Sequence, residues 1–364
     1  MPDPPSRPIT IYDVARATNV SPTTVSHAYS GKRYVEPETR ARILAVAKSL
    51  GYRPSRPARA LRTGRTNTIA FIVPATATTN SQEVLALDYY MELAVGAARA
   101  SFTRGYPMVI APSFQSQGDI RDLATDGVII VDPRKRDRRI DLCLEAGVPV
   151  VTIDRDAGRP EHDEVVRADN EGDMTRLLEH LTAAGARQIG LVAPSTSGSW
   201  ALETRLAYRE WCRAHRQRPM IERAPVHAGR ESGAEAAGRL FDRPHPPDAV
   251  IALESQHVFG VLSAARTHRI DVPGELLVAT GTDCAEARFG TPSVTAIDVM
   301  PAEQGSAAAN MLVDLVEGIE HERPVVSPSQ LRVRQSTTRH ASAGDGKVPA
   351  PHPPRPLMHS HAAS

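Results

Sequence analysis

The feature that most constrains this fold is an alternation of continuous apolar runs with amphipathic stretches, and the cycle occurs twice. The first cycle predicts strands at 68–73, 107–111, 127–131 and 148–153, with helices at 86–105, 137–146 and 171–185. The second predicts strands at 188–193, 220–226, 248–253 and 276–281, with helices around 200–216, 231–241 and 256–268. Apolar strands that alternate with helices indicate parallel sheets covered on both faces. We therefore expect an α/β body of two doubly wound lobes, with a ligand cleft at the carboxyl ends of the strands.

An all-α segment precedes this body and has the spacing of a helix-turn-helix. Thr10 is the predicted N-cap of a first helix, and Asn19 takes the turn because Asn tolerates left-handed backbone. Ser21 caps a second helix, in which Pro22 occupies a position where a missing N–H costs little. A third helix follows in "VEPETRARILAVAKSLGY". Its expected apolar face consists of Ile43, Leu44, Val46, Ala47 and Leu50.

The second helix presents a polar face of short side chains. Val25 and Ala28 point inward at i and i+3. The side chains left outward are Thr23, Thr24, Ser26 and His27. Short hydroxyl side chains let a helix sit deep in the major groove of DNA, although an ordinary solvated surface is the alternative. Charge favours DNA, because residues 1–66 carry 12 Lys and Arg against 4 Asp and Glu, a net of +8, while the rest carries −7.

The stretch "YRPSRPARALRTGRTN", residues 52–67, predicts a short basic helix on a flexible joint. Ser55 would cap this helix. Isolated helices of this length are marginal in water, so we expect it to fold when DNA and a partner copy hold it. Leu61 would then be an exposed apolar side chain, which fits a wedge between base steps in the minor groove.

Residues 10–74, from "TIYDVARATNVSPTTVSHAYSG" to "TIAFIVP", resemble the lactose/purine repressor (LacI/GalR) family of bacterial transcription regulators without a gap. The resemblance implies a homodimer with a helix-turn-helix DNA-binding domain, a hinge helix and a body like a type I periplasmic binding protein. It also implies discontinuous lobes. The helix at 301–319 would return to the first lobe, and 329–337 would complete the second.

Carried over by position, the resemblance implies particular DNA contacts. Thr10, Ser21 and Tyr52 match phosphate contacts, whereas Pro22, Thr23 and His27 match base-reading positions. Ala58 and Leu61 match the hinge, with Leu61 as the intercalating side chain. The full candidate DNA-binding set is Thr10, Ser21, Pro22, Thr23, Thr24, Ser26, His27, Tyr34, Tyr52, Ser55, Ala58 and Leu61.

Two positions depart from the family pattern. Most members have Arg where this chain has His27, which weakens the expected contact with guanine. Pro57 replaces a small or branched apolar residue of the hinge, although Pro is tolerated in the first turn of a helix.

The domain organisation expected from these features has five parts. They are a flexible N-terminus (1–8), the helix-turn-helix domain (9–54), the hinge and linker (55–67), the two-lobed body (68–338) and a disordered Pro- and His-rich tail (339–364). Within the body, the first lobe is expected at about 68–168 and 299–322, and the second at about 169–298 and 323–338. In "QSQGDIRDLATDG" the usual helix of the first lobe is truncated or lost.

Polar residues at the strand ends are the candidate effector ligands. Asp154, Glu254 and Asp283 match positions at which the family binds sugar hydroxyls, and a carboxylate can accept two hydroxyl hydrogen bonds. The alternative for each is a helix N-cap. Thr204 stands where a ligand-binding Arg is frequent, with Arg205 beside it. The aromatic candidates for stacking on a ligand are Tyr89, Tyr90, Phe114 and Trp200. A cleft that contains these acids but lacks the frequent ligand-binding Arg favours neutral sugars, polyols or cationic groups over anions.

Enzymatic and secreted alternatives have little support in the sequence. No G-x-S-x-G, P-loop or H-E-x-x-H motif is present, so we expect no catalytic residues, cofactor or metal. Cys143, Cys212 and Cys284 are scattered, and no signal peptide or transmembrane run is evident. We therefore predict a soluble, cytoplasmic regulator, most simply a repressor, that binds a pseudo-palindromic operator. The alternatives are a solute-binding protein or a sugar-processing enzyme with the same two-lobed fold.

Overall fold

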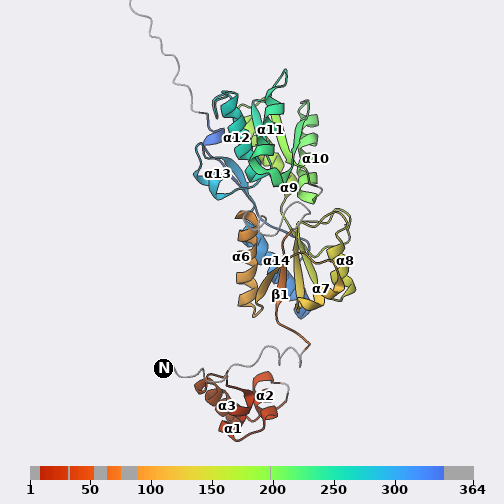
Figure 1. The fold of residues 1–364 in the computed structure, drawn as a ribbon, viewed down its shortest axis with the longest axis vertical. Coiled ribbons are helices and arrows are strands. Elements are labelled where there is room, and N and C mark those ends of the chain that lie inside the picture. Colours follow the sequence, from red (N-terminus) through yellow and green to blue (C-terminus); the bar gives the residue numbers. More distant parts are fainter. Residues whose placement is uncertain (1–8, 32, 53–63, 75–87, 197, 340–364) are drawn as a thin grey trace, which may run out of the picture.

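The structure is a computed structural model and describes residues 9–31, 33–52, 64–74, 88–196 and 198–339. The predicted hinge contacts of Ser55, Ala58 and Leu61 lie outside the described residues, as do the Pro57 departure and the tail beyond residue 339. Figure 1 shows the small N-terminal helical domain and the two α/β lobes of the body.

Three helices form the N-terminal domain, as the sequence predicted: α1 (Ile11–Thr18), α2 (Pro22–Ser30) and α3 (Pro37–Ser49). Asn19 and Gly31 both have left-handed backbone and end α1 and α2, respectively. The core of the bundle consists of the buried residues Val14, Ala15, Val25, Ala28, Ile43 and Ala47.

The predicted apolar face of α3 was too wide. Ile43 and Ala47, four residues apart, are buried, whereas Leu44 and Leu50 are each 37% exposed. The physical reason is the small size of the bundle, because two short helices cover only a narrow stripe of α3.

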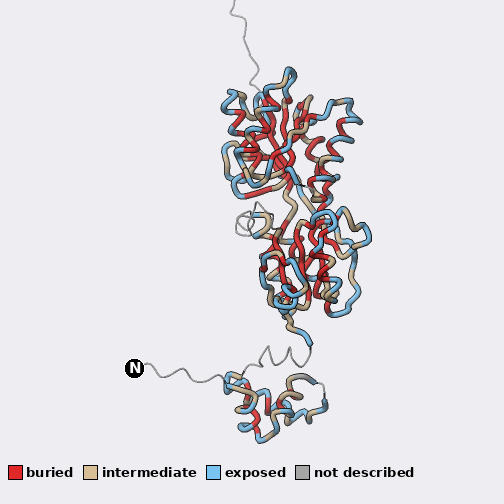
Figure 2. The backbone as a smooth tube through the Cα atoms, turned by 45° about the vertical axis from the view of Figure 1, so that its right-hand side comes forward, coloured by how far each residue is buried: buried red, intermediate tan, exposed pale blue. Residues whose placement is uncertain are grey.

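The first lobe is built on a six-stranded, fully parallel sheet with the order β11-β5-β4-β3-β1-β2. Its strands are β1 (Ile69–Ile72), β2 (Met108–Ala111), β3 (Gly127–Val131), β4 (Val150–Ile153), β5 (Val165–Arg167) and β11 (Val325–Val326). The strands β1, β3 and β4 are buried throughout, which explains their continuous apolar sequences. Figure 2 shows these buried strands at the centre of the lobe.

Helices cover both faces of this sheet. One face packs against α6 (Asp88–Thr103) and α14 (Pro301–Glu317), and the other packs against α7 (Gln117–Asp122) and α8 (Arg138–Glu145). The six-residue α7 is the truncated helix that the sequence predicted. Gly96 and Gly305 let α6 and α14 cross closely, because a Cβ at either would lie 2.0 Å from a backbone oxygen of the other helix.

The second lobe repeats this architecture with the sheet order β12-β10-β9-β8-β6-β7. Its strands are β6 (Ile189–Pro194), β7 (Met220–Ala224), β8 (Ala249–Ala252), β9 (Leu277–Thr280), β10 (Thr295–Asp298) and β12 (Gln330–Arg332). Among the described strands of this sheet, β10 and β12 pair antiparallel and the other neighbours pair parallel. The helices α9 (Asn170–Ala183) and α10 (Ser199–Ala214) cover one face of the sheet. The other face is covered by α11 (Gly229–Phe241), α12 (Ser255–Thr267) and the short α13 (Ala285–Phe289).

The chain passes between the lobes three times, which produces the discontinuous lobes that the family resemblance implied. The crossings follow β5, β10 and β11. The last one lies a few residues later than expected, because Val325 and Val326 pair with β5 of the first sheet. Among the described residues, no helix is long and apolar enough to cross a membrane.

Candidate functional site

The first candidate surface is the outward face of α2. Ser21 caps this helix, since its Oγ accepts a hydrogen bond from the Thr24 backbone N–H at 3.0 Å. Val25 and Ala28 are fully buried, and Thr23 is exposed. Arg40 of α3 donates to the Ala28 carbonyl at 3.0 Å and ties the end of α2 to the bundle. Among the side chains predicted to point outward, Thr23 is exposed, whereas Thr24, Ser26 and His27 are half-buried.

The other predicted DNA-binding residues lie around this helix in different environments. Thr10 begins α1 and donates from its Oγ1 to Asp13 at 2.7 Å. Tyr34 is 88% exposed, whereas Tyr52 is half-buried with its ring edge-on to Tyr29 at 5.8 Å. Tyr12 of α1 is 67% exposed, a large aromatic side chain that the sequence analysis did not single out.

The second candidate site is a cleft of about 680 Å³ lined by both lobes. Within each sheet, the order of the first five strands of that lobe is the same, 2-1-3-4-5 when counted in chain order. Segments that follow the strands meet at the cleft: Pro74, Asp132 and Asp154 from the first lobe, and Ser195, Glu254 and Asp283 from the second. Ligands of doubly wound folds bind at these carboxyl ends, so the topology itself builds the site.

Two acids form the centre of the cleft. Asp132 directly follows β3 and Asp154 directly follows β4, and both have left-handed backbone with φ of 46° and 70°. Non-glycine residues seldom adopt this conformation, and such positions concentrate at functional sites. The Tyr90 hydroxyl donates to Asp132.

Both acids favour their protonated forms, because the cleft desolvates their carboxyl groups. Burial raises the pKa of Asp132, and burial together with the Asp132 charge raises the pKa of Asp154 well above its usual range. The cleft centre therefore offers a donor and several acceptors side by side, which suits a hydroxyl group that both donates and accepts.

Glu254 reaches the same region from the second lobe. Burial, followed by the charge of Asp132, raises the pKa of Glu254 to about 7. Glu254 precedes α12 but makes no capping hydrogen bond with its side chain, and no helix follows Asp154. The capping alternative therefore lacks support at these two positions.

Aromatic side chains form the walls of the cleft. The rings of Tyr89 and Tyr90 lie edge-to-face with centroids 5.0 Å apart, and Trp200 lines the cleft from α10 of the other lobe. The Tyr89 hydroxyl donates to Gln304 at 3.4 Å. Aromatic rings on two sides and acids at the base fit the apolar faces and the hydroxyl edges of a sugar.

Asp283 also lines the cleft, but the protein itself uses its carboxylate. Its two oxygens accept hydrogen bonds from the backbone N–H of Cys284 at 3.0 Å, from Arg288 at 3.0 Å and twice from Arg334 at 2.8 Å. A carboxylate has about four lone-pair positions, so none remains for a ligand. Asp283 thus positions the wall of the cleft.

Three predicted effector residues do not line the cleft. Phe114 is 4% exposed and packs in the core against α7 and α8, because the chain turns inward after β2. Thr204 is 3% exposed and donates to the Trp200 carbonyl at 2.6 Å. Arg205, the next residue of α10, does not line the cleft either; burial, and then the charges of Arg223 and Arg209, lower its pKa. These three predictions were wrong. The end of a strand can be located from the sequence, but the direction in which a nearby side chain points cannot.

Several residues of the cleft were not predicted from the sequence. Asp132 had a usable signal, since it directly follows the apolar run "GVIIV" just as Asp154 follows "VPVVTI". Asn170 and Gln304 are buried at the starts of α9 and α14 and had no such signal. Asp88 lines the cleft and accepts a hydrogen bond at 2.8 Å from the N–H of Ala285, which joins the two lobes.

Comparison with known proteins identifies the family of this chain. Residues 10–55 match the family model of the bacterial regulatory proteins of the lacI family, and residues 178–337 match a periplasmic binding protein-like domain. The HTH-type transcriptional regulator CelR of Thermobifida fusca is 30% identical over 339 residues, which cover 90% of this chain and 98% of CelR. The chain belongs to the lacI family. It is a DNA-binding transcription regulator with an effector-binding body, rather than a solute-binding protein.

Solved structures of the lacI family have the same fold. A complex of the regulator CelR with cellobiose covers 90% of this chain and 99% of its own, with a TM-score of 0.68 and 28% identity. The lac repressor dimer bound to operator and an anti-inducer covers 92% of this chain and 100% of its own, with a TM-score of 0.76 and 21% identity. Both similarities extend over the helix-turn-helix domain and the two lobes.

Proposed function

We propose that this lacI-family protein is a homodimeric repressor whose affinity for a pseudo-palindromic operator is set by a neutral carbohydrate in the inter-lobe cleft. The pair of acids Asp132 and Asp154, in a cleft that is also lined by Tyr89, Tyr90 and Trp200, is the observation that carries the proposal. A site with several buried acids disfavours anionic ligands. The cellobiose complex of the related CelR supports a sugar, and we propose a mono- or disaccharide.

The DNA contacts follow from the position of α2. The helix would enter the major groove with Thr23 and His27 toward the base edges, while Thr10, Ser21 and Tyr52 would contact phosphates. The hinge contacts of Leu61 and its neighbours remain predictions from the sequence. A regulator of this kind acts at the chromosome, so we place it in the cytoplasm, associated with the nucleoid when bound. We propose no catalytic role.

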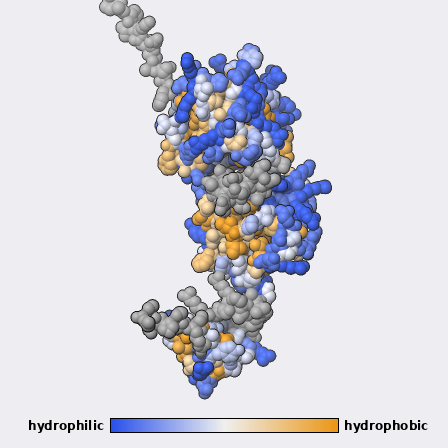
Figure 3. Space-filling model, viewed as in Figure 1, coloured by the Kyte–Doolittle hydropathy of each residue, from blue (hydrophilic) through white to orange (hydrophobic). Residues whose placement is uncertain are grey.

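Two exposed apolar regions support a homodimer. Met91, Val95 and Phe102 form a stripe along α6 and are 43%, 58% and 70% exposed. Ile110 of β2 is 46% exposed and lies on the sheet face that α6 covers. Figure 3 shows the apolar surface over this part of the first lobe. Monomeric proteins rarely leave such a surface uncovered.

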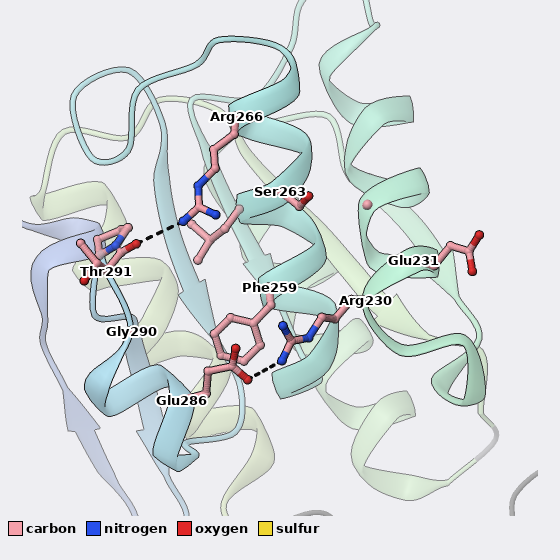
Figure 4. A pocket seen from close by; sticks show the side chains of 11 residues that line it. Arg230, Glu231, Phe259, Ser263, Arg266, Glu286, Gly290 and Thr291 are labelled. Atoms are coloured by element: carbon pink, nitrogen blue, oxygen red, sulfur yellow. Dashed lines mark hydrogen bonds and ion pairs between the residues drawn. The ribbon is translucent and has the colours of Figure 1, made fainter.

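The second region lies on the second lobe, next to the start of α6. Phe289 at the end of α13 is 85% exposed, beside a hollow of about 360 Å³ formed by α11, α12 and the segment after α13 (Figure 4). Arg230 lies over the Phe259 ring and pairs with Glu286 at 2.6 Å, so the polar groups here are satisfied internally. An apolar side chain of a second copy fits this hollow.

The dimer is tested by light scattering of two variants of the full chain. Val95→Asp on α6 is expected to shift the protein to a monomer and to weaken operator binding, because a dimer reads two half-sites at once. Leu206→Asp is the control, since Leu206 is 52% exposed on α10, away from both regions. A dimer that persists in Val95→Asp would exclude this surface.

The function itself is tested by selecting DNA from a random library with the full chain. We expect an inverted-repeat consensus and binding that weakens steeply as salt rises, because the N-terminal domain neutralises phosphates. Enrichment of no sequence, with salt-dependent binding alone, would contradict a sequence-specific regulator.

A further inference from the structure

Arg205 belongs to a cluster of three arginines on the outer face of the second lobe, which we call the arginine triad: Arg205 and Arg209 of α10, and Arg223 of β7. Residues four apart on a helix lie on the same face, so Arg205 and Arg209 are neighbours. None of the three lines the cleft or the hollow beside α13.

The packing of α10 on β7 brings the triad together. Tyr208 of α10 accepts a hydrogen bond at 2.9 Å from the N–H of Met220, the first residue of β7. Ile221 packs against the core cluster that contains Tyr208. Side chains two apart on a strand share a face, so Arg223 projects on the same side as Ile221, toward α10. All three arginines therefore lie on the side of the second sheet that α10 covers.

No carboxylate among the described residues balances the triad. Burial, and then the charges of Arg223 and Arg209, lower the pKa of Arg205. The nearby acids have other partners: Glu203 accepts from Asn170, Glu210 lies 4.0 Å from Arg213, and Glu222 pairs with Arg239 and Arg243.

One donor of the triad is buried without a partner. The Nη1 atom of Arg205 is inaccessible to solvent and makes no hydrogen bond. A buried donor that lacks an acceptor is costly, and three like charges at close range add to this cost. An oxyanion held by the exposed side chains of Arg209 and Arg223 would offset the repulsion between the three charges, because it supplies acceptor oxygens and the opposite charge.

We propose that the arginine triad binds a phosphate group, at a site separate from the cleft. Guanidinium groups match phosphate oxygens with parallel N–H donors, and this geometry makes arginine the preferred residue for such recognition. The buried acids of the cleft disfavour a phosphate, whereas the triad attracts one. The protein thus has two ligand sites of opposite chemistry.

The test compares inorganic phosphate with chloride at equal ionic strength, using the full chain. Equal ionic strength matters because any salt screens the repulsion between arginines. We expect phosphate to raise the unfolding temperature of the wild type above its value in chloride. Calorimetry should show about tenfold weaker phosphate binding at this site in Arg205→Gln and in Arg223→Gln, the loss expected for one charge-assisted contact.

Arg187→Gln is the matched control, because Arg187 is an exposed arginine of the same lobe that precedes β6 and lies on neither α10 nor β7. It should bind phosphate like the wild type. Any phosphate that binds the N-terminal domain adds the same signal in every variant. The difference in phosphate affinity between variants therefore reports on the triad. Near-ultraviolet circular dichroism confirms that each variant is folded.

A second arm replaces inorganic phosphate with glucose 6-phosphate. Equal affinity assigns the site to the free ion, and tighter binding assigns it to a phosphorylated metabolite. Both outcomes support a phosphate site. The proposal is overturned if phosphate and chloride act alike on the wild type, or if Arg205→Gln and Arg223→Gln respond to phosphate as Arg187→Gln does.

Discussion

Arg334 and Asp283 are joined by two hydrogen bonds of 2.8 Å, one to each carboxylate oxygen. The pair is nearly enclosed, with 16% of the Arg334 side chain and 4% of the Asp283 side chain exposed. It fastens α13 and the wall of the cleft to the segment after β12. A residue predicted to bind effector thus serves first to hold the second lobe together.

Asp283→Asn is expected to lower the free energy of unfolding by roughly 2–4 kcal/mol, since it leaves enclosed arginine charge without its partner. Chemical denaturation by urea measures this loss. Asp298→Asn is the control, because its partner Arg332 is 43% exposed and such pairs contribute about 1 kcal/mol or less. Equal losses in the two variants would show that the Asp283 network has no special structural role.

The cleft acids predict how stability depends on pH in the absence of ligand. Their raised pKa values mean that the folded state binds more protons than the unfolded state between the ordinary carboxyl range and about pH 7. Stability should therefore fall as the pH rises through this window. Glu254→Gln removes one of these groups and should reduce the fall by roughly 1–2 kcal/mol.

Urea denaturation of this variant at pH 5 and pH 7.5 gives the comparison. Glu210→Gln is the control, because the Glu210 side chain is 66% exposed on α10. If Glu254→Gln loses as much stability across this range as Glu210→Gln does, Glu254 does not titrate as described.

Close helix packing gives a prediction about the first lobe. A Cβ at Gly305 would lie 2.0 Å from the Leu93 carbonyl oxygen, so Gly305→Ala must push α14 and α6 apart. We expect the free energy of unfolding, measured by thermal denaturation, to fall by roughly 1–3 kcal/mol. Gly118→Ala should be nearly neutral, since the nearest atom to the added Cβ is Ser116 Oγ at 3.4 Å.

The sequence predicted the parts of the fold that have a strong local pattern. The buried strands β1, β3 and β8 were located because both faces of each strand are covered, which requires an unbroken apolar run. The short elements β5, β11 and α13 were missed. They have two to five residues, too few to show a period, and β11 pairs with a strand far away in sequence.

The sequence predicted those residues of the candidate cleft whose position depends on the backbone alone. Asp154 and Glu254 follow strands, so the topology places them in the cleft wherever their side chains point. Phe114 and Arg205 depended on side-chain direction and were wrong. The hydrogen-bond acceptors of Asp283 are occupied in part by Arg334, which is about fifty residues away in the chain. No local sequence pattern could reveal this pairing.

The recognition helix gives a prediction about specificity. His27 lies on the outward face of α2, where most family members have arginine. His27→Arg should change base preference in each half-site by about 1–3 kcal/mol, the range for one good side-chain contact with a base. Selection from a random library with both proteins measures the change. The same consensus from both would show that this position does not face the bases.

The most direct test of the account is a fluorescence anisotropy titration of the selected operator, with and without a panel of neutral mono- and disaccharides that includes cellobiose. We expect at least one sugar to change operator affinity by about fivefold or more, within the usual range of allosteric coupling. Asp154→Asn should abolish this response and keep the operator affinity of the ligand-free protein. Operator affinity that no sugar alters, or a response that survives in Asp154→Asn, would contradict a carbohydrate-controlled cleft.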